Sequence, residues 1–244
     1  MAITFALSSL EERKDLSYSQ KDSLYFFMAM AYDQQKKDSI SEIYFLKVSD
    51  SSSLYMRSNF LVAQKCIKRN DFKKANGILS NLPLTDNENT NEFKYFLEQG
   101  TALIIGKPTP LGNEDRKLKL TKPNLQKEMA QLEFLSREKS KLKKKSPWIA
   151  GALSAIVPGL GKVYAGSNAQ GLATFIRVTL LAGLATENYL RHGIKNPQFW
   201  FFGGLASAYY VGGIYGSVYL PKLNYQEKID AIHQDAKVGL LSAY

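Results

Sequence analysis

The sequence predicts an all-α protein whose polar helical front is followed by a bundle of two or three membrane-spanning helices. Apolar residues between positions 21 and 82 recur at helical spacing, without the alternation typical of strands. Charge is unevenly distributed, because only eleven charged residues occur among the ninety-eight that follow residue 146. Three segments in that last part are long and mostly apolar. We therefore expect a water-exposed domain joined to a lipid-embedded one.

The front domain, expected over residues 1–105, has an internal repeat. A shift of 34 residues superposes apolar or small residues of one segment on those of the next. The matched pairs are Phe26 with Phe60, Phe27 with Leu61, Ala29 with Ala63, Ser41 with Ala75, Tyr44 with Ile78, Phe45 with Leu79, and Val48 with Leu82. Small residues at two of these pairs would let paired helices approach closely. The alternative is an ordinary helical bundle with a chance period.

Residues 21–86 resemble two tetratricopeptide repeats, which share this 34-residue period. The usual early aromatic is present as Tyr25 but is Asn59 in the second unit, and the closing proline is missing from both. Residues 91–105 resemble the first helix of a third unit, and residues 2–14 could end an earlier one. The resemblance implies a concave surface that binds a protein or peptide partner.

Residues 106–146 are expected to form a linker and then a basic amphipathic helix. Two prolines and two glycines between residues 106 and 122 disfavour a continuous helix. From 124 to 145 the helical pattern returns, with Leu125, Met129, Leu132 and Leu135 on one side. A cluster of six basic residues, here called the basic cluster, ends this segment. It consists of Arg137, Lys139, Lys141, Lys143, Lys144 and Lys145.

The basic cluster could contact lipid headgroups, nucleic acid or only water. Its position favours lipid, since the chain turns apolar at residue 147 and lysines beside an apolar span mark the cytoplasmic side of a membrane. We therefore expect membrane lipid as a partner and no nucleic acid.

Three candidate spans make up an expected membrane domain over residues 147–220, and residues 221–244 are expected to form a terminal amphipathic helix. The spans are 148–164, 171–189 and 197–220. The third looks strongest because its twenty-four residues carry no charge and are long enough to cross the hydrocarbon core. A glycine-rich soluble core is the alternative, but it would leave the basic cluster unexplained.

The first span ends in a glycine-rich turn at Pro158, Gly159, Gly161, Tyr164 and Gly166. Proline and glycine should end or bend the helix there, so the span either crosses with a kinked end or re-enters. Residues 143–190 resemble the two-transmembrane-span domain family, and especially uncharacterised bacterial membrane proteins that join helical repeats to such a domain. The Asp-Arg-aromatic triplet of many members is replaced by Lys162-Val163-Tyr164. No catalytic activity follows from this resemblance.

A phosphate-binding loop is excluded at this turn, because Ile156 and Val163 stand where that motif needs Gly and Ser or Thr.

On the third span Gly204, Ala208, Gly212 and Gly216 repeat every four residues and predict a helix-packing face. Its partner would be another span of this chain or, alternatively, the same face of a second copy in a homodimer. Arg177 lies six residues into the second span. It could snorkel to the interface, pair internally or contact a lipid phosphate.

The sequence offers no enzyme, metal or cofactor signature. One cysteine, Cys66, and two histidines, His192 and His233, cannot assemble a zinc cluster, and neither histidine lies in a catalytic motif. We predict no catalytic, cofactor-binding or metal-binding residue.

The predicted function is therefore a membrane-anchored protein-interaction or assembly scaffold. The alternative is a membrane-embedded structural or transport component with a regulatory repeat domain. Charge bias places the repeats in the cytoplasm at a bacterial inner membrane. Three crossings would put the C-terminus outside, whereas a re-entrant first span would leave both ends inside. A lost export signal would instead place the repeats in the periplasm.

Overall fold

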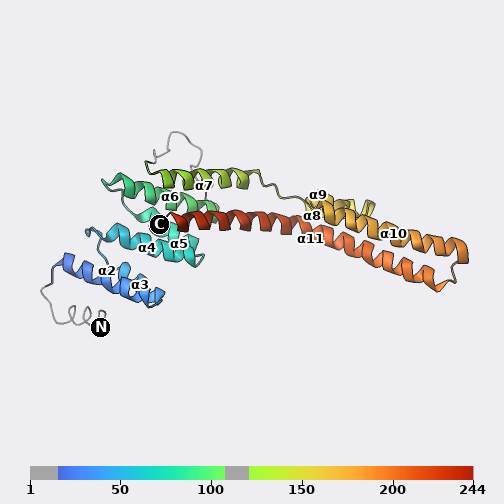
Figure 1. Ribbon diagram of the computed structural model, residues 1–244, viewed down its shortest axis with the longest axis horizontal. Helices are drawn as coiled ribbons and strands as arrows, with labels where there is room; N and C mark the ends of the chain where they lie inside the picture. Colours follow the sequence, from blue (N-terminus) through green and yellow to red (C-terminus); the bar gives the residue numbers. More distant parts are fainter. Residues whose placement is uncertain (1–15, 108–120, 244) are drawn as a thin grey trace. The chain divides into compact units, whose positions relative to one another are not determined.

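The computed structural model describes residues 16–107 and 121–243 (Figure 1). These two stretches form α-helices joined by turns and contain no strand, which confirms the all-α prediction. The expected helix over residues 2–14 and most of the expected linker lie outside the described residues. The chain divides into two compact units, residues 1–138 with 233–244, and residues 139–232.

The first unit begins with two helical hairpins and a fifth helix (Figure 1). The helices are α2 (Tyr18–Gln34), α3 (Asp38–Phe45), α4 (Tyr55–Lys68), α5 (Phe72–Asn81) and α6 (Glu88–Ile105). The turns of the two hairpins have the same geometry. Lys36 and Asn70, 34 positions apart, take positive φ angles of 58° and 64°. The next amide in each turn donates to the carbonyl five residues earlier, at 3.0 Å from Lys37 and 2.8 Å from Asp71. The hairpin turn therefore recurs with the 34-residue spacing of the sequence repeat.

The core of these hairpins is formed by the matched positions of the repeat. Ala29 and Ala63 are fully buried, as are Ser41 and Ala75. Such small side chains let the two helices of a hairpin approach closely. Phe27 is an exception because it is 67% exposed.

Two further segments complete the core of the first unit. Helix α7 (Pro123–Lys141) ends four residues earlier than expected and buries one apolar side. The buried residues are those predicted: Leu125, Met129, Leu132 and Leu135. The second segment is residues 233–242, the end of α11 (Pro197–Ser242), where Ala236 and Leu240 are each 1% exposed.

Leu240 is held against α6. A Cβ added to Gly100 would lie 2.4 Å from Leu240 Cδ2, so the Leu240 side chain packs directly on the α6 backbone and would have to shift for any larger residue there. Lys237 Nζ also donates to the Lys68 carbonyl oxygen at 3.0 Å and to Asn70 Oδ1 at 2.7 Å. The expected separate helix over residues 221–244 is thus the continuation of α11, and its last described residues belong to the first unit.

The second unit contains α8 (Pro147–Ile156), α9 (Leu160–Ala165), α10 (Asn168–His192) and the first part of α11. Figure 1 shows α10 and α11 as an antiparallel pair. Near the connecting loop the rings of Tyr189 and Phe199 lie 5.5 Å apart. Further along, a Cβ on Gly213 would lie 3.1 Å from Thr174 Cγ2.

The ranking of the candidate spans differs from the sequence prediction. In the part of the chain that the structure describes, α10 alone is both long enough and apolar enough to cross a membrane. The segment 197–220, expected to be strongest, lacks charge but contains five glycines and four tyrosines, which lower its mean hydropathy. The first segment is divided between the ten-residue α8 and the six-residue α9, and each is too short to cross about 30 Å of hydrocarbon at about 1.5 Å per residue.

Candidate functional site

The basic cluster spans two local structures. Arg137, Lys139 and Lys141 lie in the last turns of α7, whereas Lys143, Lys144 and Lys145 precede α8 outside any helix. Pro147 is the first residue of α8, and the residue before a proline avoids helical angles, so a helix is disfavoured at Ser146. Ser146 accordingly has an extended backbone, with φ −72° and ψ 125°.

Part of the cluster lines a cavity of about 250 Å³, here called the lysine pocket. Lys141, Lys143 and Lys145 meet Lys228 of α11 around it, and no carboxylate contributes to its lining. Its other lining residues are Leu142, Ala165, Gly166, Pro221, Asn224 and Tyr225. Sequence reasoning missed Lys228, because the chain was divided at residue 220. No local signal indicated it, because the proline at position 221 would usually end a helix.

Aromatic rings and amides hold the lysine pocket together. Lys145 Nζ donates to the Tyr164 carbonyl oxygen at 2.6 Å and lies 5.4 Å from the centre of the Tyr164 ring. Lys144 lies 5.3 Å from the centre of the Tyr225 ring. Asn224 Nδ2 donates to the Ala165 carbonyl oxygen at 3.2 Å. These contacts hold Lys144 and Lys145 directly before α8, where the apolar segment begins. Cations at such a position are suited to anionic lipid headgroups.

The glycine-rich turn joins α8 to α9. Gly159 and Gly166 have φ angles of 85° and 101°, which residues with a side chain rarely adopt. A Cβ on Gly161 would lie 1.8 Å from the Ala150 carbonyl oxygen. The Gly161 amide also donates to Ser154 Oγ at 3.0 Å. Glycine is therefore required here for close approach between α9 and α8.

After this turn, α9 ends close to the first residue of α8. The Ser146 amide donates to the Tyr164 hydroxyl at 3.4 Å, next to the Lys145 contact with the same residue. The first apolar segment is thus a short helical hairpin whose two ends lie together.

The helix-packing face predicted on α11 is not the face that contacts α8 and α10. Within the described residues, a Cβ on Gly204 or Gly212 would meet no atom within 4 Å. The buried residues are Ala206, Gly213 and Ser217 instead, and Ser217 Oγ lies 2.6 Å from Ser154 Oγ of α8. Of the predicted face, Gly216 lies beside the side chain of Lys162, and Ala208 and Gly212 line a second cavity.

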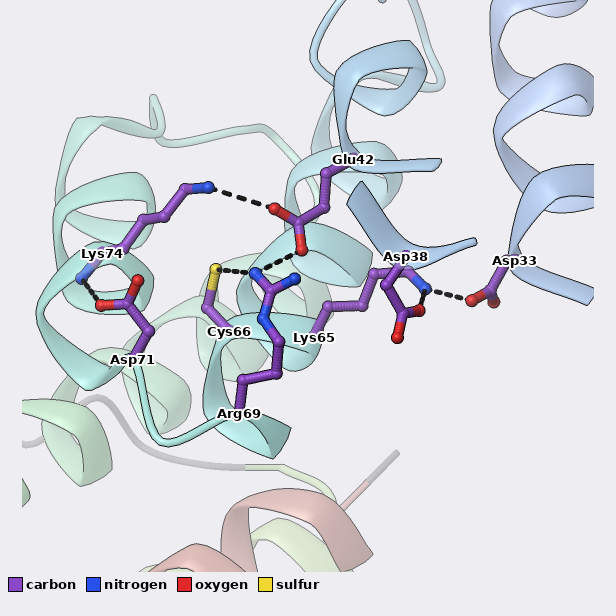
Figure 2. Close-up of polar contacts among 8 residues, drawn as sticks. All are labelled: Asp33, Asp38, Glu42, Lys65, Cys66, Arg69, Asp71 and Lys74. Carbon is purple, nitrogen blue, oxygen red and sulfur yellow. Dashed lines mark hydrogen bonds and ion pairs between the residues drawn. The ribbon is translucent and has the colours of Figure 1, made fainter. Parts of the chain in front are cut away.

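In the first unit, ion pairs join the two hairpins (Figure 2). Lys65 of α4 pairs with Asp33 at the end of α2 and, at 2.7 Å, with Asp38 at the start of α3. Glu42 of α3 is buried and pairs with Arg69 at 2.5 Å and with Lys74 at 3.1 Å. Sequence reasoning did not identify these pairs, because their partners are 27 to 32 positions apart.

The ion pairs of this network stabilise the packing of the two hairpins. The hydrogen bond from Lys65 holds the pKa of Asp38 below its usual value. Burial lowers the pKa of Lys65, but the hydrogen bonds to Asp33 and Asp38 outweigh that effect and raise it. Cys66 lies beside Arg69, and its burial raises the pKa of the thiol, so the thiol stays protonated at neutral pH.

No known protein family, curated protein or solved structure matches the chain. The site is therefore interpreted from its own geometry.

Proposed function

We propose that this chain is a non-enzymatic, membrane-anchored scaffold for protein interaction or assembly. In this proposal the second unit is held in a lipid bilayer and the first, a tetratricopeptide-like unit, binds a protein or peptide. The observation that carries it is the exposure of large apolar side chains along α10 and α11.

The exposed side chains suit lipid better than water. Only 22% of the apolar window of α10 is buried, whereas the core helix of a soluble protein is mostly buried. Leu172, Leu180 and Leu190 are 60%, 62% and 76% exposed. Trp200, Phe201, Val211, Tyr215 and Tyr219 of α11 are also exposed. A soluble monomer rarely exposes so large an apolar surface. In a bilayer, the same surface would contact acyl chains.

The proposed topology has two crossings. Helix α10 has 25 residues and a length of about 37 Å, enough to cross, and the antiparallel part of α11 would return beside it. The hairpin of α8 and α9 would re-enter from the side on which it began. The basic cluster and Lys228 would then face the cytoplasm of a bacterial inner membrane, and Arg191 and Lys195 the other side. This distribution follows the positive-inside rule.

The proposed partner surface is on the first hairpin. Phe27 of α2 is 67% exposed, and Ile43 and Leu46, at the end of α3, are 55% and 49% exposed. Exposed apolar side chains on paired helices suit an apolar protein or peptide surface.

The alternative, a structural or transport component, has one observation in its favour. Lys162, Thr174 and Arg177 line a cavity between the helices of the second unit. A transport role predicts that substitutions in this cavity abolish function while the first hairpin is dispensable. The scaffold predicts the reverse.

Crosslinking in membranes, followed by mass spectrometry of the captured proteins, tests the proposal. We expect a protein partner whose capture falls at least fivefold in a Phe27→Ser, Ile43→Ser variant. Leu84→Ser is the matched control, since Leu84 is 75% exposed but lies outside this hairpin. Capture of no protein, or equal capture by all variants, would contradict the scaffold.

A further inference from the structure

We propose that the cavity lined by Lys162, Thr174 and Arg177 binds the phosphate group of a phosphate ester. The cavity, here called the cationic pocket, has a volume of about 400 Å³. The inference builds on the membrane anchoring proposed above, because it assigns a ligand to the anchored unit.

Two cations reach the cationic pocket from different helices. Lys162 of α9 donates from Nζ to Thr174 Oγ1 at 2.9 Å. The Thr174 hydroxyl itself donates to the Gln170 carbonyl oxygen at 2.8 Å, so its oxygen is free to accept from Lys162. Arg177 follows Thr174 by three positions on α10 and therefore lies on the same side of that helix. The hydrogen bond to Thr174 thus positions the Lys162 ammonium group in the pocket that Arg177 also lines.

Small residues of α11 provide the space for these groups. A Cβ on Gly216 would lie 3.6 Å from Lys162 Cε and 3.8 Å from its Nζ. Ala208, Gly212 and Gly213 line the pocket with little side-chain volume. This explains why small residues recur on a face of α11 that the other described helices do not fill.

The pocket carries positive charge without a compensating carboxylate. No Asp or Glu occurs in the sequence between Glu138 and Glu187, and Glu187 pairs with Arg191 at 2.9 Å. No described residue forms an ion pair with Arg177 or Lys162. Lys162 is half-buried and Arg177 is exposed on the surface proposed to face lipid, where two neighbouring cations are costly unless an anion neutralises them. The geometry therefore calls for an anionic ligand.

Phosphate is the anion that best fits these donors. Arginine offers a planar fork of N–H groups that matches phosphate oxygens, and lysine adds a compact charge. Leu205 and Tyr209 form an apolar wall beside them, suited to the organic part of an ester. Such a phosphate could belong to an anionic lipid headgroup or to a soluble ester, and the experiment must separate these sources.

Native mass spectrometry of the detergent-solubilised full chain tests the proposal. The probes are phosphatidic acid, which carries a phosphate monoester, soluble glycerol phosphate, and a neutral diacylglycerol that lacks phosphate. We expect phosphatidic acid to bind and diacylglycerol not to. If glycerol phosphate binds equally well, the source is a soluble ester, and if it does not, the source is lipid. Both results support a phosphate site, whereas binding of neither phosphate probe would overturn it.

Substitutions of the two cations test whether the phosphate binds in the cationic pocket. Lys162→Gln and Arg177→Gln should each weaken binding about tenfold or more, because each removes a charge-assisted contact, while Arg177→Lys should keep part of the affinity. Arg191→Gln is the control, since this arginine is on the same helix but outside the pocket. Equal affinity in the Arg191 and Arg177 variants would overturn the assignment.

Filling the pocket gives a second test that leaves its charges in place. Gly212→Leu should block binding, because the new side chain enters the cavity without a clash at its Cβ. Gly204→Leu, in the same series of small residues but outside the pocket, should not. Unchanged binding in Gly212→Leu would contradict the proposal. Retention in the membrane after alkaline carbonate washing is a separate readout, so failure of the anchor and failure of the ligand site are distinguishable.

Discussion

Gly161 lets α9 approach α8, and Gly159 lets the turn between them approach α10, because neither residue has a side chain. Added Cβ atoms would lie 1.8 Å from the Ala150 carbonyl oxygen and 2.2 Å from the Gly171 carbonyl oxygen, respectively. Neither oxygen can move without shifting a helix backbone. The conformation of this hairpin therefore depends on two single residues.

We predict that Gly161→Ala destabilises the second unit by about 1–3 kcal/mol, the usual cost of overpacking. Thermal unfolding of the detergent-solubilised chain, followed by circular dichroism, measures the loss. Gly183→Ala is the control, because a Cβ there meets no described atom within 4 Å and alanine favours helix. Equal melting temperatures for the two variants would show that the close approach is absent.

The Lys65 network predicts a particular pH dependence. The folded-state pKa of Asp38 is lowered from 3.8, so its stabilising contribution is present above pH 3.8 and is lost as the pH falls through the lowered value. The folded-state pKa of Lys65 is raised from 10.5, so its contribution is present below pH 10.5 and is lost as the pH rises through the raised value.

The difference in melting temperature between the wild type and Lys65→Met should therefore stay constant from about pH 5 to 9 and change below pH 3.8. Lys73→Met, a substitution of an exposed lysine, should track the wild type throughout. A difference that is independent of pH down to pH 2 would contradict the ion pairs.

At the residue scale, the sequence predicted where the chain turns better than it predicted which residues contact one another. Proline and glycine at 158–161 indicated the turn, because their backbone preferences are local. The α11 face of Gly204, Ala208, Gly212 and Gly216 was expected to pack against another span or a second copy. Within the chain, Gly213 and Ser217 contact α10 and α8 instead of Gly204 and Gly212, and the homodimer stays a prediction. With 3.6 residues per turn, a four-residue series rotates by about 40° at each step and drifts off any single face. Which nearby face packs depends on the neighbouring helix, which the sequence does not specify.

At the element scale, the end of α11 completes the first unit. Leu240 is 1% exposed, and Val238, two residues earlier, is 65% exposed. This segment buries its apolar side against α6, through Gly100.

We predict that Leu240→Ala destabilises the first unit by about 2–5 kcal/mol, the usual cost of deleting a buried leucine side chain. Cys66 reports on this unit directly, because it is the only cysteine and is fully buried. Its alkylation rate should rise at least about thirtyfold, if alkylation follows the population of the open state. Val238→Ala should leave the rate unchanged, and equal rates for both variants would contradict the packing.

The helices of the first unit could be predicted because their apolar spacing and 34-residue period are local patterns. The continuity of α11 could not. Pro221 removes the backbone hydrogen bond to the Ser217 carbonyl oxygen, which usually ends a helix. Here Pro221 is buried in the second unit and the helix continues through it. The local preference of proline predicted that the helix ends at Pro221, but tertiary packing maintains the helix there.

At the scale of the whole molecule, the chain leaves the first unit near residue 138 and returns to it at residue 233. Charge density falls after residue 146, which lies eight residues beyond the first of these boundaries. No compositional signal marks the second, since it depends on contacts between residues far apart in sequence. The proposed two-crossing topology is consistent with this order, because it returns the chain to the side it left.

Cysteine labelling from outside intact bacterial cells tests the two-crossing anchor most directly. Single cysteines replace the exposed residues Lys47 and His192 in a Cys66→Ala background, and permeabilised cells provide the control in which both are labelled. We predict that a membrane-impermeant reagent labels position 192 and not position 47. Labelling at position 47, or protection of position 192 until the cells are permeabilised, would contradict the account.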